Sequence, residues 1–122
     1  VVGAHLSGMA LNSELTARGA TFVKAVATAP TYRLYALPGG PPKRPGLVRV
    51  ASGGAAIETE VWALSPAAFG DFVAAIPAPL GIGTLGLADG TSVKGFLCEG
   101  AAIAGADDIT HHGGWRAYVA SG

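Results

Sequence analysis

The sequence predicts one small α+β domain that is rich in β-structure, and three observations lead to this fold class. Short apolar or alternating runs bounded by Gly and Pro recur along the chain, which is typical of strands. Only two or three segments show helical spacing or a helix-capping signal. Half of the 122 residues are hydrophobic and 13% are charged, as expected for a globular chain with a packed core. No linker or repeat divides the chain, so residues 1–122 are expected to form a single domain.

The first elements are a buried strand and a short helix. Residues 1–6 form an apolar run that ends at Ser7-Gly8, which predicts a strand followed by a tight turn. A helix should begin at Asn12 or Ser13, because either side chain can cap the first amides. Gly19 is expected to end this helix.

The remaining elements are mainly strands. Local patterns predict strands at 20–28, 32–37, 46–51, 55–64, 82–87 and 92–98. The turn sequence Ala88-Asp89-Gly90 indicates a hairpin between the last two. A second helix should begin at Ser65-Pro66 and end before Pro77, since proline disfavours the helical conformation of the preceding residue. A last helix or turn should carry Trp115.

His5 is the first candidate for chemistry. It lies just before the Ser7-Gly8-Met9 turn, and backbone amides at such a turn and helix start can converge on an anion. Histidine titrates near neutral pH, so His5 can protonate a reacting atom bound there. The alternatives are a hydrogen-bonded histidine within a strand and a turn that only connects two elements.

Four cations lie close together in the sequence. Arg33, Lys43, Arg44 and Arg49 fall within 17 residues of one another, and a guanidinium matches a carboxylate bidentately. They can bring positive charge to the mouth of a pocket, or each can simply be solvated.

Two carboxylates share one face of the strand at 55–64. Glu58 and Glu60 are two residues apart, a spacing that suits acid–base work and is also typical of a solvated sheet face. No metal site is expected, because the adjacent His111 and His112 would face opposite ways and no second ligand has the right spacing.

Composition limits the partners and the compartment. Eight basic and eight acidic residues cancel, which argues against nucleic acid or an anionic membrane as a partner. No apolar run approaches the roughly 20 residues that span a bilayer. The single cysteine, Cys98, cannot form an internal disulfide and suits a reducing compartment, so we expect the protein in the cytoplasm.

The whole chain resembles the C-terminal domain of allophanate hydrolase. The resemblance rests on the start Gly3-Ala4-His5-Leu6-Ser7-Gly8-Met9, the segments 45–49, 76–83 and 93–99, the strand Thr59-Glu60-Val61-Trp62, and the end Gly113-Gly114-Trp115-Arg116-Ala117-Tyr118. It implies a γ-glutamylcyclotransferase-like fold, a small mixed β-barrel or sheet with two to three short helices.

The resemblance also implies a place in urea degradation. A separate amidase-signature domain hydrolyses allophanate, and this domain would bind the product N-carboxycarbamate, a small dicarboxylate, and promote its decarboxylation. In this reading His5 is the proton donor, and the Ser7, Gly8 and Met9 amides with Arg49 hold the carboxylates. Glu60 is a candidate for the pocket wall. No cofactor is implied, and we expect a homodimer.

Neither amidase nor cyclotransferase activity is expected from this chain alone. It lacks the Ser-Ser-Lys apparatus of the amidase domain. Ile76 and Pro77 stand where active cyclotransferases have a catalytic glutamate. Two alternatives to catalysis remain open, which are a non-catalytic assembly or dimerisation module of the same enzyme and a binder of small carboxylates.

Overall fold

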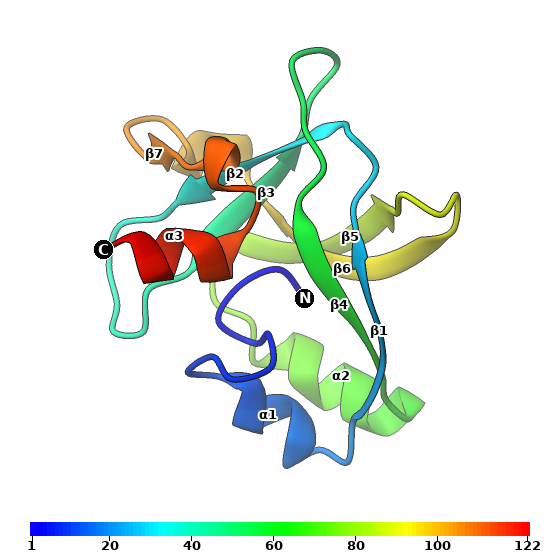
Figure 1. Cartoon of the computed structure of the whole chain (residues 1–122). Coiled ribbons are helices and arrows are strands. Elements are labelled where there is room, and N and C mark those ends of the chain that lie inside the picture. Colours follow the sequence, from blue (N-terminus) through cyan, green and yellow to red (C-terminus); the bar gives the residue numbers. More distant parts are fainter.

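The computed structural model describes residues 1–122 and contains three helices and seven strands (Figure 1). The helices are α1 (Asn12–Thr16), α2 (Pro66–Ala74) and α3 (Trp115–Ser121). The strands are β1 (Thr21–Ala27), β2 (Tyr32–Ala36), β3 (Pro45–Arg49), β4 (Glu58–Ala63), β5 (Leu80–Gly86), β6 (Ser92–Cys98) and β7 (Asp107–Asp108). Two short 3₁₀ turns lie at Gly100–Ala102 and Thr110–His112. The α+β class is confirmed.

The strands form three small sheets rather than one mixed barrel or sheet. Strand β1 pairs with β4, β2 lies between β3 and β7, and β5 pairs with β6; every pair is antiparallel. Two isolated bridges, Thr28–Leu87 and Tyr32–Ala55, connect residues of different sheets or of their linking loops. In Figure 1, α1 and α2 lie together at one end of β1 and β4, whereas α3 lies near β2 and β3.

The expected strand over residues 1–6 is wrong. The main chain turns back on itself, with the N–H of Leu6 donating to the Gly3 carbonyl (3.0 Å). Only Val1 pairs with β4, through hydrogen bonds in both directions with the main chain of Glu60 (2.8 and 3.0 Å). Residues 2–6 are all buried, as the apolar run predicts, but they are buried in a coil of turns and not in a strand.

Helix α1 begins without the expected cap. Leu11 occupies the N-cap position and no side chain bonds the first amides. The Asn12 side chain instead donates to the His5 carbonyl (2.8 Å), so it ties the helix to the N-terminal turns. The helix is only five residues long, and Gly19 with a positive φ of 74° follows it, as expected for a helix stop.

The other local signals agree with the structure to within a few residues. The Ser65 hydroxyl accepts a hydrogen bond from the Ala68 N–H at the start of α2 (3.1 Å), and Pro66 is the first helical residue. Strands β5 and β6 form the expected hairpin. Strand β7 is absent from the prediction because two residues carry no periodic pattern.

The hydrophobic core joins the sheets to the N-terminal turns and to α3. Its buried residues are Val2, Leu6, Tyr32, Leu34, Leu47, Ile57, Leu85, Ile109 and Trp115. Because Leu6 has no exposed surface, the segment that carries His5 is held within the core. None of the three helices could span a lipid bilayer, since the longest, α2, has nine residues.

Candidate functional site

His5 lines a cavity of about 50 Å³ between the N-terminal turns, α2, β6 and the start of β3. We call this the His5 cavity. Its charged and titratable side chains are His5, Glu14 and Arg44, and its apolar side chains are Val1, Val2, Ala4, Pro45, Phe72, Ala75, Ile76, Pro77, Leu80 and Phe96. A few polar groups within an apolar enclosure are typical of a small-molecule site.

The His5 ring is held by one carboxylate and two aromatic rings. Its Nε2 lies 2.7 Å from Oε1 of Glu14. Phe72 and Phe96 meet the ring edge to face, with centroids at 5.0 and 5.7 Å. Burial lowers the pKa of His5 below its ordinary value, although the hydrogen bond to Glu14 works against this shift. The lowered pKa favours the neutral imidazole, and a neutral ring that donates from Nε2 to Glu14 has its lone pair on Nδ1.

Arg44 is the cation that lines the His5 cavity. Its charge is close enough to contribute to the lowered pKa of His5. Arg33 is paired with Asp108 (2.6 Å), and Lys43 lines a different groove. Arg49, the cation that the sequence favours, is exposed at the end of β3 and is not part of the cavity wall. Arg44 directly precedes β3 and lines the cavity with Pro45, whereas Arg49 lies at the other end of this strand.

The Ser7-Gly8-Met9 turn does not line the His5 cavity, contrary to the sequence-based expectation. The Ser7 N–H donates to Oε1 of Glu60 (2.8 Å), and the Met9 N–H donates to the Leu6 carbonyl (2.9 Å). Gly8 and Met9 face a separate groove beside α3. The carboxylate at this turn is therefore that of the protein's own Glu60.

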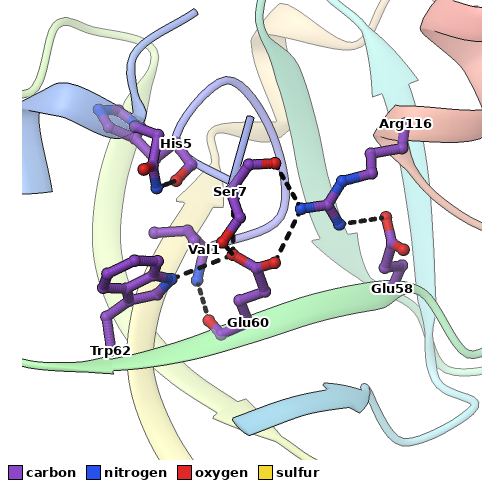
Figure 2. A network of polar contacts seen from close by, with 8 residues as sticks. Val1, His5, Ser7, Glu58, Glu60, Trp62 and Arg116 are labelled. Carbon is purple, nitrogen blue, oxygen red and sulfur yellow. Dashed lines mark hydrogen bonds and ion pairs between the residues drawn. The ribbon is translucent and has the colours of Figure 1, made fainter. Parts of the chain in front are cut away.

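Glu60 lies at the centre of a buried polar network, which Figure 2 shows. Its Oε1 accepts hydrogen bonds from the Ser7 N–H, the Ser7 hydroxyl (3.0 Å) and the Trp62 indole (3.1 Å). Its Oε2 accepts one from Arg116 (2.8 Å). Arg116 also donates to the Ser7 carbonyl (2.7 Å) and lies 3.3 Å from Oε1 of Glu58.

The network explains the ionisation of Glu60. Burial would raise the pKa of this carboxyl, but the hydrogen bonds from Arg116, Ser7 and Trp62 hold it below its ordinary value. Glu60 is 5% exposed, so the solvated face suggested by strand alternation is wrong at this position. Glu60 is also not on the wall of the His5 cavity; it lines a neighbouring apolar pocket with Trp62.

Sequence reasoning missed two residues of these arrangements. Glu14 is an acidic residue near the expected start of a helix, and a strand over residues 1–6 gives no reason to place it against His5. Arg116 lies 109 residues from Ser7, and no local spacing connects them. No group of three His, Cys, Asp or Glu side chains is arranged to hold a metal ion.

Comparison with known proteins decides the family. Residues 1–120 match the family model described as the allophanate hydrolase C-terminal domain. The chain belongs to this family. It is 45% identical over 122 residues to urea amidolyase of Saccharomyces cerevisiae. This match covers 97% of this chain and 7% of that protein. The urea amidolyase of Lachancea kluyveri is 43% identical and is covered to the same small extent. The chain thus spans about 7% of the length of these curated relatives.

Solved structures of family relatives have the same fold. Allophanate hydrolase of Kluyveromyces lactis is 43% identical, with a TM-score of 0.94 over 98% of this chain and 20% of that one. A uropathogenic E. coli-specific protein is 35% identical, with a TM-score of 0.89. That match covers 98% of this chain and 91% of the E. coli chain, so this fold makes up most of the solved E. coli chain.

Proposed function

We propose that this domain binds N-carboxycarbamate in the His5 cavity and promotes its decarboxylation. The observation that carries the proposal is a buried histidine, paired with Glu14 and facing Arg44, within an otherwise apolar enclosure. The reaction belongs to urea degradation, in a larger enzyme whose amidase-signature domain releases the substrate. The relatives named urea amidolyase and allophanate hydrolase support this assignment. A γ-glutamylcyclotransferase-like topology and a cytoplasmic location, which fits the free thiol of Cys98, belong to the same proposal.

The size of the cavity suits a small dicarboxylate, and Arg44 offers one cation to it. One water needs about 10–15 Å³, so about 50 Å³ accommodates several waters or a ligand of a few heavy atoms. Arg44 would bind one carboxylate, and a guanidinium can do so bidentately. A larger substrate would have to extend past Arg44 into the neighbouring groove formed by the proline-rich loop.

The His5–Glu14 pair would supply the proton that the reaction consumes. A bound dianion attracts positive charge, which opposes the effect of burial and favours protonation of His5 at Nδ1 by water. Glu14 stabilises the resulting imidazolium. The imidazolium transfers its proton to the substrate nitrogen, the carbon–nitrogen bond breaks with its electron pair going to nitrogen, and CO₂ leaves. The other product is carbamate, and His5 is neutral again.

Arg44→Gln is expected to weaken binding of malonate, a stable dicarboxylate, by about 10-fold, since one charge-assisted contact is lost. Arg49→Gln is the matched control and should change the dissociation constant less than about twofold, because Arg49 lies outside the cavity wall. Isothermal titration calorimetry on the 122-residue chain measures both. A larger loss with Arg49→Gln would return the role of carboxylate anchor to Arg49.

The non-catalytic alternative, an assembly module, has its own support in the structure. Strand β1 has one partner, β4, and exposes Phe22 (50%) and Val23 (53%) beside its open edge. Open strand edges with apolar side chains favour pairing with another chain. In this alternative the occupant is a second copy of the domain, giving the expected homodimer.

Light scattering after size exclusion tests the assembly alternative. If β1 forms the contact, the wild-type chain should have the mass of a dimer and Phe22→Ser/Val23→Lys that of a monomer. His5→Ala is the control and should keep the wild-type mass. A wild-type monomer at all accessible concentrations would contradict dimerisation through β1.

A further inference from the structure

We infer that Glu60 and Arg116 are positioning residues for His5, acting through the main chain of Ser7. The ligand that His5 would contact comes from the proposed function. The positioning of His5 by Glu60 and Arg116 does not depend on that ligand. Neither side chain lines the His5 cavity, so neither is placed to touch a ligand bound there.

Ser7 is held on all its polar sides by this one ion pair. Its N–H and hydroxyl both donate to Oε1 of Glu60, at 2.8 and 3.0 Å. Its carbonyl accepts from Nη2 of Arg116 at 2.7 Å, and the same nitrogen binds Oε2 of Glu60 at 2.8 Å. The pair therefore fixes both the position and the orientation of the peptide groups around Ser7 (Figure 2).

His5 depends on this turn because no sheet holds its segment. Between Gly3 and Met9 the main chain is stabilised by turn hydrogen bonds and lies outside every strand. On one side His5 is tied to α1, through the Asn12 amide on its carbonyl and Glu14 on its ring. On the other side, the segment is held two residues further along, where Ser7 bonds to Glu60 and Arg116. If Ser7 is released, the His5 ring can move relative to Glu14 and Arg44, and more water can reach the ring.

The chemistry of the contacts requires a carboxylate at position 60. Every hydrogen-bond partner of the Glu60 carboxylate is a donor. These donors are the N–H and O–H of Ser7, the indole N–H of Trp62 and the guanidinium of Arg116. Glutamine has nearly the same shape, but its NH₂ group would face one of these donors. Glu60→Gln therefore disturbs the hold on Ser7 with little change in packing volume.

The experiment compares Glu60→Gln and Arg116→Gln with Glu58→Gln. Glu58 approaches the same guanidinium but does not contact Ser7, so it is the matched control. The readouts are the His5 pKa by NMR titration, malonate affinity by calorimetry and the melting temperature. In the two test variants we expect the His5 pKa to rise toward its usual value as water enters, and malonate affinity to fall about 10-fold. Both quantities should stay at the wild-type values in Glu58→Gln.

The outcomes separate this inference from the proposed function. A His5 pKa that rises in both test variants supports the inference even if malonate binds no variant, in which case only the ligand assignment fails. Folded test variants with wild-type His5 pKa and affinity overturn it. If either glutamine variant fails to fold, Ser7→Ala and Arg116→Lys weaken the same contacts more gently, and the same pKa rise, smaller in size, is then required.

Discussion

His5→Ala is expected to slow CO₂ release from N-carboxycarbamate by about 10²–10⁴-fold, the usual contribution of general acid catalysis. The measurement uses a full-length enzyme in which this domain accompanies an active amidase domain, so that substrate is formed in place. The side chain lies at a cavity wall, so the oligomeric state should not change. The expected rate loss follows because the other two charged side chains of the His5 cavity do not replace His5: Arg44 does not release its proton, and Glu14 acts as the acceptor that orients the ring.

His111→Ala is the matched control, because it removes an exposed histidine outside the His5 cavity. It should release CO₂ at the wild-type rate. The wild-type kcat/KM should fall as pH rises, since the donor must be protonated, and the fall should begin below the usual histidine range because burial lowers the pKa of His5. An unchanged rate in His5→Ala, with ammonia release by the amidase domain intact, would overturn the catalytic role and leave the assembly module and the carboxylate binder.

The parts of the fold that the sequence predicts well are those set by local chemistry. Ser65-Pro66 begins α2 because a hydroxyl and a proline suit the first turn of a helix wherever it packs. Ala88-Asp89-Gly90 joins β5 and β6, with a positive φ at Gly90 that glycine adopts without strain. Residues 1–6 could not be assigned this way, because a short buried run has the same composition whether it is a strand or a coil of turns.

The site was only partly predictable, since its pairings join distant segments. His5 lines a cavity, but without the Ser7-Gly8-Met9 amides that were expected beside it, and the choice between Arg44 and Arg49 depends on how the preceding loop turns. The alternation along β4 predicts which side Glu60 takes, yet whether that side is solvated or buried depends on Arg116, 56 residues later. Spacing along one strand carries no information about a partner on another element.

Glu60→Ala is expected to lower the free energy of unfolding by about 3 kcal/mol, because removing one partner leaves Arg116 and the Ser7 N–H without their acceptor. Arg116→Ala should cost a similar amount, because it leaves the buried Glu60 carboxylate without its counter-charge and with only the Ser7 and Trp62 donors. Urea denaturation measures both variants. The double variant should lose less stability than the sum of the two single losses, by about 1 kcal/mol or more. The reason is that the second substitution removes a group that is already unpaired.

The pH dependence of stability tests whether the ionised Glu60 carboxylate supplies this stabilisation. The pKa of Glu60 is lowered in the folded state, so its contribution is fully present above the ordinary carboxyl pKa of 4.5 and is lost as pH falls through the lowered value. The stability difference between wild type and Glu60→Gln should therefore be constant from pH 7 to about pH 5 and shrink in more acidic solution. Glu58→Gln, at a half-exposed carboxylate, should differ little from wild type throughout. A difference for Glu60→Gln that grows on acidification would mean that the buried carboxyl is protonated in the folded domain, and the ion pair with Arg116 would not be what holds Ser7.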